Sequence, residues 1–372
     1  MSRRLSLPVI PEELIYEILL KLPVESLWRF RRVCKSWKTL ISHPQFAKDH
    51  LDSSISGAIM TQPRLALVYD DSNTATTYSV NSLFKNPPTL TEKLKFKMEG
   101  KHNHFVGSIN GLLCLRDVNC CFRLYNPSTK LVSRKSPAFP IEIKYLFPNN
   151  AFFGYDKVND KYKVLAFGVD LGYHVFNLVA RLYTFGESES NWRTTIQDLS
   201  FGVNNIEGSR QTFVNGNLHW LTKRGHGSDK TVIISFDVDR ETHGEVLLPL
   251  ELEDIIWSLD LHVSNKFLYV SQYSHKTCLV LWLMKEYGVQ ESWTKVMTIS
   301  LESRYCRCNA THLSPLCILG NDVVVLRNAC SCPYLVTYDS KNGQFGRRFR
   351  IERSSPRQWH GGVYHESLVP PP

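Results

Sequence analysis

Two closely spaced cysteine pairs have the residue types that could bind a metal ion. They are Cys306 with Cys308 and Cys330 with Cys332. Four thiolates can bind zinc, but structural zinc sites usually separate paired cysteines by two or more residues. A gap of one residue gives a poor bidentate grip when both cysteines lie in a strand. Buried, reduced thiols account for the pattern better, so the sequence predicts no metal site.

The remaining cysteines indicate a reducing compartment. Ten cysteines are scattered along 372 residues without a framework spacing. Adjacent Cys120 and Cys121 would point to opposite faces of a strand, where a disulfide between them would be strained. The basic start of the chain is followed by a short apolar run that Pro8 and Pro11 interrupt, which is not typical of a signal peptide. We therefore expect reduced thiols and a cytoplasmic or nuclear protein.

Two histidine motifs bear on whether the protein is an enzyme. His360-Gly361-Gly362 has the composition of an oxyanion loop, but no Gly-x-Ser-x-Gly nucleophile accompanies it, so we expect a turn before the last strand. His219-Trp220 follows a predicted tight turn, and a core-facing aromatic beside a hydrogen-bonded histidine explains this pair. The sequence contains no phosphate-binding loop, no His-Glu-x-x-His and no dinucleotide fingerprint. These patterns predict a protein without catalytic residues or cofactors.

Residues 10–51 have the periodicity of short amphipathic helices. The first helix repeats its apolar side chains at steps of three and four residues, on one face: Leu14, Ile15, Ile18, Leu19 and Leu22. Pro11 suits the first turn of this helix, and Pro23 ends it because proline lacks an N–H and clashes with the preceding turn. Three further short helices carry Leu27 and Phe30, then Trp37, Leu40 and Ile41, and then Phe46 and Leu51.

This helical segment has more apolar surface than it can bury alone. About 40 residues of short helices rarely form a self-sufficient core. The segment nevertheless offers more than a dozen large apolar side chains, including Trp28 and Trp37. A contiguous exposed apolar patch usually marks a protein interface. Periodicity alone fits equally well with a helical cap that packs on the rest of the chain.

The positive charge lies at two places. Residues 1–50 hold nine basic and five acidic residues, and residues 341–360 hold six basic and one acidic, so the rest of the +9 chain is neutral. The neutral middle shows no nucleic-acid-binding motif, so we expect acidic protein partners or solvated surfaces and no nucleic acid. No apolar run approaches the roughly 18 residues that span a bilayer, so we expect no membrane segment.

The helical periodicity of the sequence ends after residue 53. Ser53–Gly57 is polar and reads as a flexible joint. Short β-branched and aromatic runs follow, separated by Asn-Gly, Gly and Pro. The sequence therefore predicts an α+β protein by composition: a loose arm over residues 1–8, a helical module over 9–53, a linker over 54–60 and an all-β domain over 61–369.

The β region repeats with a period near 50 residues. Its turn residues are spaced 46, 59, 50 and 56 residues apart: Asn110, Asp156, Asn215, Asn265 and Asn321. Each unit holds two hairpins, and in three units the second hairpin turns at Asn126-Pro127-Ser128, Asp237-Val238-Asp239 or Asp339-Ser340-Lys341. Four strands per unit at this period predict a β-propeller. Residues 61–100 would form a less regular first blade and residues from 361 would pair with early strands, giving about six blades.

Two tryptophans mark equivalent positions in this repeat. Trp192 and Trp293 each follow a Glu-Ser pair closely. We expect both side chains to wedge between blades as structural residues.

The helical segment closely resembles the F-box, a module that docks a receptor onto the Skp-family adaptor of a cullin–RING ubiquitin ligase. The matching features are IP-EEL, EILLKLPVESL, F-RRVCKSWKTLI and P-QFAKDHL, in that order. Ile10 stands where this family usually has leucine, and Trp28 replaces a smaller aliphatic residue. Neither change removes apolar surface.

The β region is similar to the plant F-box-associated domain of S-locus-type F-box proteins, often described as kelch-like. The matching motifs include NGLLCL, YNPSTK, GYD, SNWR, VNGNLHWL, SFDVDRET and WLMKEYGVQESWTK, over roughly residues 105–350. The double glycine of true kelch repeats is absent, so a propeller-like fold is the better description.

The two resemblances together imply a non-catalytic substrate-recognition subunit of an SCF-type ubiquitin ligase. The F-box would bind a Skp-family adaptor, and through it cullin and RING subunits, while propeller loops would bind an unidentified protein for ubiquitination. The adaptor-binding residues expected from this match are Ile10, Pro11, Leu14, Ile18, Leu19, Leu22, Pro23, Leu27, Phe30, Val33, Cys34 and Trp37. Some of them must pack inside the module.

Two other functions remain open from the sequence. The protein could hold a partner with the adaptor alone, without ubiquitination. It could also be a propeller enzyme with an unrelated helical cap. That enzyme would need clustered acidic or histidine residues along the central channel, and the sequence shows no such pattern.

Overall fold

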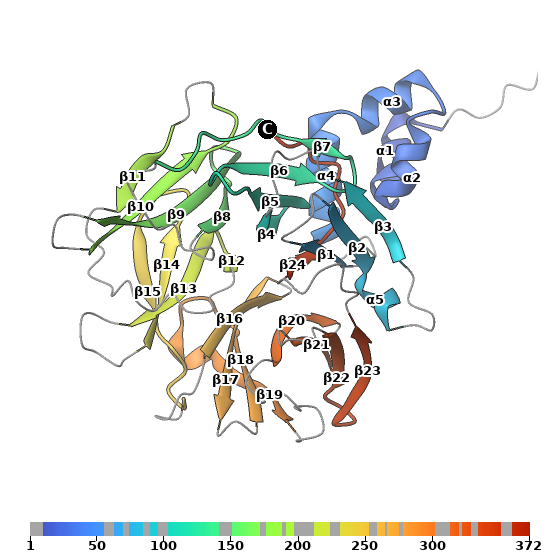
Figure 1. The fold of residues 1–372 in the computed structure, drawn as a ribbon. Coiled ribbons are helices and arrows are strands. Elements are labelled where there is room, and N and C mark those ends of the chain that lie inside the picture. The colour runs from blue at the N-terminus through green and yellow to red at the C-terminus, as the bar shows by residue number, and fades with distance from the viewer. Residues whose placement is uncertain are drawn as a thin grey trace, which may run out of the picture.

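The computed structural model has four N-terminal helices beside a ring of six four-stranded sheets (Figure 1). The residues it describes are 10–55, 63–69, 74–84, 90–95, 103–140, 151–171, 176–187, 191–196, 212–223, 231–252, 259–264, 266–274, 278–301, 313–319, 322–328, 334–350 and 359–372. The predicted arm over residues 1–8 lies outside them.

The helical module consists of α1 (Glu12–Leu20), α2 (Val24–Phe30), α3 (Lys35–Ile41) and α4 (Pro44–Ile55). Helix α1 ends before Pro23, as the sequence predicts. Pro23 directly precedes α2 and Pro44 starts α4, because proline is tolerated at the start of a helix and not in its interior. None of the described helices is long and apolar enough to cross a lipid bilayer.

The flexible joint predicted at Ser53–Gly57 is wrong for residues 53–55, which are helical. Helix α4 continues through Ile55. The hydroxyl of Ser54 donates a 2.8 Å hydrogen bond to the His50 carbonyl, one turn earlier, which lets a serine remain in the helix. Residues 56–60, the rest of the predicted linker, lie outside the described part of the chain.

Each blade is an antiparallel four-stranded sheet. Blade 1 contains β1 (Arg64–Tyr69), β2 (Thr74–Ser79), the short helix α5 (Val80–Leu83) and β3 (Leu90–Lys95), and it is completed by β24 (Trp359–Tyr364). Blade 2 contains β4 (His104–Ile109), β5 (Leu112–Arg116), β6 (Phe122–Asn126) and β7 (Leu131–Val132). Blade 3 contains β8 (Ala151–Asp156), β9 (Lys161–Leu171), β10 (Phe176–Thr184) and β11 (Arg193–Ile196).

The second half of the ring follows the same order. Blade 4 contains β12 (Thr212–Val214), β13 (Asn217–Lys223), β14 (Thr231–Asp237) and β15 (His243–Val246). Blade 5 contains β16 (Leu259–Ser264), β17 (Phe267–Ser274), β18 (Cys278–Met284), the 3₁₀ turn η2 (Gln290–Ser292) and β19 (Trp293–Ser300). Blade 6 contains β20 (Leu313–Leu319), β21 (Val323–Asn328), β22 (Tyr334–Asp339) and β23 (Gln344–Arg350).

The ring is closed by strands from opposite ends of the sequence. The strands β24, β4, β8, β12, β16 and β20 lie next to one another around the inside of the ring. Strand β24 pairs antiparallel with β1, from Arg64 opposite Tyr364 to Tyr69 opposite Trp359. The predicted six blades and the predicted pairing of residues from 361 with early strands are both confirmed.

The expectation of a turn at His360-Gly361-Gly362 is wrong, because these residues lie inside β24. A Cβ atom on Gly361 would come 2.2 Å from the Ala66 carbonyl oxygen, and one on Gly362 would come 2.6 Å from the ring of Phe105. Both glycines are needed for close approach within a strand rather than for a turn.

The blades pack through an apolar layer between each neighbouring pair. Strand β9 shows how one strand serves two layers: Val164 and Ala166 pack with blade 2, whereas Leu165 and Phe167 pack with blade 4. Side chains alternate between the faces of a strand, so a strand that is covered on both faces needs a continuous apolar run.

Two hairpin turns have the backbone conformation that their sequences predict. Asn110 and Gly111 have φ of 54° and 78°, and Asn215 and Gly216 have φ of 54° and 79°. Asn-Gly suits such two-residue turns because both residues tolerate positive φ. In blade 3 the turn is longer, and Asp160 rather than Asp156 has positive φ (54°). Asn265 and Asn321 lie outside the described residues.

The outer hairpin turns of three blades are capped by the same side-chain hydrogen bond. The side-chain oxygen Oδ1 of the first turn residue accepts the N–H two residues later: Asn126 from Ser128 (2.8 Å), Asp237 from Asp239 (3.0 Å) and Asp339 from Lys341 (2.9 Å). This side-chain cap explains why the repeats keep Asn or Asp at this position.

The two marked tryptophans occupy equivalent wedges. Trp192 and Trp293 are buried, and each indole N–H donates to a carbonyl of the preceding blade, Pro137 O (3.1 Å) and Leu247 O (2.9 Å). The predicted structural role of both tryptophans is confirmed.

Candidate functional site

The helical module has a small core of its own. Its buried side chains are Leu19, Val24, Leu27, Ile41, Phe46 and Ala47, and Leu368 from the end of the chain joins them. The ring of Tyr16 packs edge-on against Phe46, with centroids 5.3 Å apart. The core is too small to hold all the apolar residues of the module, so several remain at the surface.

Four large apolar side chains of the module are solvent-exposed. They are Ile10 (54% exposed), Leu14 (49%), Ile18 (54%) and Val33 (61%). Leu14 and Ile18 lie one helical turn apart and therefore share one face of α1. Solvent-exposed side chains of this size gathered on one small module form the kind of surface that binds another protein.

The structure sorts the twelve residues predicted from the F-box resemblance into three groups. The exposed group contains Ile10, Pro11, Leu14, Ile18, Pro23, Val33 and Cys34. The half-buried group contains Leu22, Phe30 and Trp37. Leu19 and Leu27 are at most 1% exposed and belong to the core of the module. These two leucines are internal packing residues, which periodicity alone could not separate from the others.

Helix α4 holds the loop between α1 and α2, a role that the sequence analysis missed. The imidazole Nε2 of His50, which is fully buried, donates to the Leu22 carbonyl at 2.8 Å. Burial lowers the pKa of His50, which keeps the ring neutral, while the hydrogen bond to Leu22 opposes this shift. Tyr16 donates its hydroxyl proton to Asp49 on the same helix. The sequence contained one indication of this role, the position of His50 on the apolar face of the fourth predicted helix.

The connection between α2 and α3 is ordered by local contacts. Phe30 and Trp37 pack edge-on with ring centroids 5.5 Å apart. The Sγ atom of Cys34 accepts the Trp37 N–H at 3.5 Å and so caps α3. Hydrogen bonds from Ser36 and from the Trp37 backbone lower the pKa of this exposed thiol. These contacts fix Val33 and Cys34 at the surface beside the half-buried Trp37.

The module touches the ring at blade 3 through α4. Lys48 Nζ lies 2.6 Å from Asp160 Oδ2 in the β8–β9 turn, and Tyr155 donates to the other oxygen of Asp160 at 2.5 Å. Burial would raise the pKa of Asp160, but Lys48 and Tyr155 lower it. About half of each charged side chain in the Lys48–Asp160 pair is exposed, so the pair contributes about 1 kcal/mol or less.

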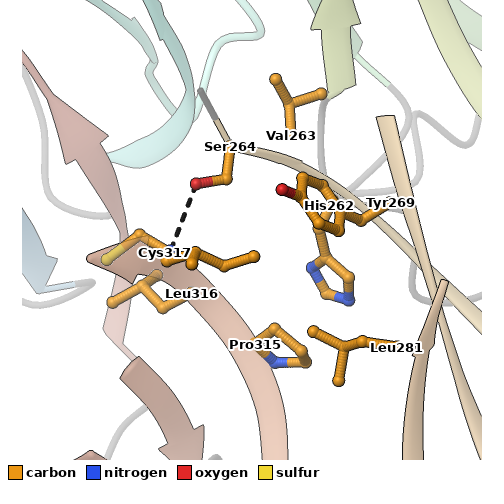
Figure 2. Close-up of a pocket in the computed structure, with 9 residues that line it drawn as sticks. His262, Val263, Ser264, Tyr269, Leu281, Pro315, Leu316 and Cys317 are labelled. Carbon is orange, nitrogen blue, oxygen red and sulfur yellow. Dashed lines mark hydrogen bonds between the residues drawn. The ribbon is translucent and has the colours of Figure 1, made fainter. Parts of the chain in front are cut away.

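The propeller has recesses that are small for a bound molecule. One lies between blades 5 and 6, beside His262, Tyr269 and Pro315 (Figure 2), and its volume of about 10 Å³ holds about one water. A second, of about 100 Å³, lies beside Lys266, Lys285 and other residues of blades 4 and 5. Small-molecule sites usually start near 300 Å³. Both recesses are smaller than that.

Among the described residues, the side chains that could bind a metal ion are not gathered into a site. The Cys306–Cys308 and Cys330–Cys332 pairs lie outside the described residues. Within the described ranges, no three His, Cys, Asp or Glu side chains lie close enough to hold a metal ion. His219 is fully buried, and its Nε2 lies 2.7 Å from the hydroxyl of Tyr287, while Trp220 packs between blades 3 and 4. The predicted hydrogen-bonded histidine beside a core aromatic is confirmed.

The protein thus has two parts, a helical module with exposed apolar side chains and a six-bladed propeller. Residues 7–49 match the F-box domain, and residues 64–367 match the F-box associated beta propeller domain. The second match covers well over half of the chain, so this protein belongs to the F-box proteins with an F-box associated β-propeller.

Three proteins of Arabidopsis thaliana that are similar to this chain match it over most of their own length. An F-box/kelch-repeat protein is 27% identical over 368 residues, covering 97% of this chain and 96% of its own. One F-box protein is 26% identical over 388 residues, covering 97% of each chain. Another is 28% identical over 374 residues, covering 90% of this chain and 86% of its own.

Proposed function

We propose that this protein is the substrate-recognition subunit of an SCF-type cullin–RING ubiquitin ligase. The F-box docks on a Skp-family adaptor, the adaptor links it to cullin and RING subunits, and the propeller holds the protein to be ubiquitinated. F-box domains in general indicate binding to Skp-type adaptors. The protein itself contributes binding and no catalytic step, and it acts in the cytoplasm or the nucleus.

The exposed apolar face of the module carries this proposal. Leu14 and Ile18 lie one turn apart on α1 and Val33 follows α2, and exposed apolar side chains concentrated on one small module favour a protein partner. Burying three side chains of this size against an adaptor stabilises a complex by several kcal/mol. The half-buried Leu22, Phe30 and Trp37 extend this face where the adaptor closes over it.

The substrate surface is proposed at the turns and strand ends of the propeller. Loops at the ends of a ring tolerate sequence change while the strands keep their packing. Binding there raises the effective concentration of a substrate lysine near the ubiquitin-loaded enzyme held elsewhere in the complex.

The test replaces two exposed residues by charged ones, Ile18→Asp together with Val33→Asp. We expect the affinity for a Skp-family adaptor to fall by about 100-fold, because each residue would be an anchor of the interface. Binding of purified full-length chain to purified adaptor is measured by isothermal titration calorimetry.

The matched control is Val158→Asp, on the β8–β9 turn, where the side chain is 79% exposed. This control should bind the adaptor like the wild type, and both variants should keep the thermal unfolding midpoint of the ring. Unchanged adaptor affinity in the Ile18 and Val33 double variant would refute the proposed interface.

A further inference from the structure

Residues 365–372, which we call the strap, leave the end of β24 and lie between the propeller and the helical module (Figure 1, red). Ser367 is completely buried and Leu368 is 8% exposed. Glu366, at the start of the strap, pairs with Arg64 of β1 at 2.7 Å. The strap is therefore packed along its first half rather than loose on the surface.

The ring side of the strap is held by blade 2. Asn126, which is completely buried, donates from Nδ2 to the carbonyls of Ser367 (3.0 Å) and Val369 (2.7 Å). Its Oδ1 accepts the Ser128 N–H. The Asn126 side chain therefore caps its own hairpin turn with one end and binds the strap with the other. The Ser367 hydroxyl donates to the Asn110 carbonyl at 2.7 Å. Buried hydrogen bonds of this kind are costly to break because the groups are left without water.

The blade surface is shaped for this contact. A Cβ atom on Gly111 would lie 2.4 Å from the Ser367 hydroxyl oxygen and 2.7 Å from the His365 carbonyl oxygen. A glycine that leaves room for a backbone to approach indicates a built contact. The tip of the strap also comes close to blade 3, where Pro372 would lie 3.1 Å from a Cβ on Gly186.

The other side of the strap enters the helical module. Leu368 lies in the same apolar cluster as Leu19, Leu27 and Phe46. Val369 packs both on this cluster and on the layer between blades 2 and 3. Two neighbouring residues thus join the core of the module to the core of the ring.

The direct contact between the module and the ring is weaker. The Lys48–Asp160 pair is half-exposed, and exposed ion pairs restrain orientation poorly. The strap supplies buried hydrogen bonds and apolar contacts on both sides instead. Without the strap, the Lys48–Asp160 pair would still join the module to the ring, but it is half-exposed.

We propose that Ser367, Leu368 and Asn126 are positioning residues, which fix the angle between the adaptor-binding module and the propeller. This inference rests on the proposed function, since a fixed angle sets the distance between a propeller-bound lysine and the ubiquitin-loaded enzyme. Transfer depends on holding the reacting groups together in one geometry. Loosening the module spreads the lysine over a larger volume and lowers its effective concentration.

The first experiment measures the angle. Fluorophores on noncanonical residues at Lys38 in α3 and Lys295 in β19, both exposed, report the module-to-ring distance in the full chain bound to its adaptor. We expect a single narrow distance distribution in the wild type and a broad one after deletion of residues 367–372. A deletion of residues 371–372, which keeps the Asn126 and Leu368 contacts, is the matched control and should stay narrow.

The second experiment measures transfer. A lysine-bearing acceptor peptide inserted in the β22–β23 turn makes the assay independent of the natural substrate. Deletion of residues 367–372 should lower the rate of ubiquitin transfer to this peptide about tenfold while the adaptor dissociation constant changes less than twofold. Leu368→Ala, which removes part of one side chain and keeps the strap, should give an intermediate rate, and Leu368→Met should restore it.

The outcomes test the role of the strap separately from the proposed ligase function. A distance distribution that stays narrow without the strap overturns the inference. A broad distribution with an unchanged transfer rate also overturns it, because the strap would then hold the fold without positioning the substrate. Absence of transfer in the wild type, with adaptor and ligase subunits present, would refute the proposed function. The distance measurement would still decide whether the strap fixes the module.

Discussion

At the scale of single residues, His219 shows how burial controls a titratable group in this ring. Its side chain has no exposed surface and contacts the hydroxyl of Tyr287. Burial lowers its pKa to about 4 from an ordinary 6.5, although hydrogen bonding at Thr212 and Asn217 opposes the shift. The imidazole is therefore neutral in the folded protein over the whole physiological range.

This residue predicts a pH dependence of stability. Between pH 6.5 and 4 the unfolded chain binds a proton at His219 that the folded chain does not, so the free energy of unfolding decreases as pH falls. The loss through this residue approaches about 3 kcal/mol near pH 4. Urea unfolding of the wild type and of His219→Gln at pH 7, 6, 5 and 4.5 measures it. The variant should show a shallower decline.

His50 and His365 also have pKa values lowered by burial, so they add slope of the same sign. Only the difference between the wild type and the His219 variant therefore isolates His219. Parallel declines in the two proteins would contradict the prediction.

A buried lysine shows how turns of neighbouring blades are joined. Lys163 Nζ lies 2.6 Å from Asp156 Oδ2 and 2.9 Å from Glu241 Oε1, and it donates to the Val238 carbonyl at 2.9 Å. Burial would raise the pKa of Asp156, but Lys163 and Asn159 lower it to about 2. Charges this deeply buried are tolerated because each has a hydrogen-bonded partner. The sequence marked Asp156 only as a turn residue, because its bond to Lys163 crosses the β8–β9 hairpin and Lys163 is also held by Glu241 of blade 4.

At the scale of elements, β24 decides how the ring closes. Its glycines were interpreted from the sequence as a turn, since two adjacent glycines usually mark one. In the structure they lie in a strand pressed between β1 and the Phe105 side chain of β4. That neighbourhood brings together residues almost 300 positions apart, so no local pattern could indicate it.

Gly361→Ala is expected to destabilise the ring by about 3 kcal/mol, because the new Cβ meets backbone that cannot move without disturbing the β1–β24 pairing. Gly216→Ala is the comparison. Nothing lies within 4 Å of a Cβ there, and only its positive φ of 79° opposes the change, at about 1 kcal/mol. Thermal unfolding of both variants gives the difference. Equal losses would show that β24 is not tightly held.

At the scale of the whole molecule, the ring depends on residues from its two ends. Deletion of residues 359–372 removes β24 and leaves β1 and the inner edges of blades 2 and 6 uncovered. We expect the chain to lose its single cooperative thermal transition and to become sensitive to proteolysis. Deletion of residues 367–372 alone should keep that transition, since it leaves β24 in place. Indistinguishable melting curves for the longer deletion and the wild type would contradict the closure.

The sequence by itself determined the elements and their number. Prolines lie at the starts of three of the four helices and Asn-Gly turns form hairpins, because both signals act within a few residues. The period near 50 residues gives the blades. The helical module was identified by the resemblance of its motifs to the F-box, and periodicity alone left a helical cap equally open.

Only the tertiary structure decided which apolar residues of that module face inward. Leu14 and Leu19 belong to one periodic pattern, yet Leu14 is exposed and Leu19 is buried, because α4 and the strap cover just one side of α1. Likewise, Asn126 was predicted as a turn residue, and its grip on Ser367 spans 241 residues. Local signals specify what a segment becomes, whereas the choice of neighbour depends on how the closed ring brings distant segments together.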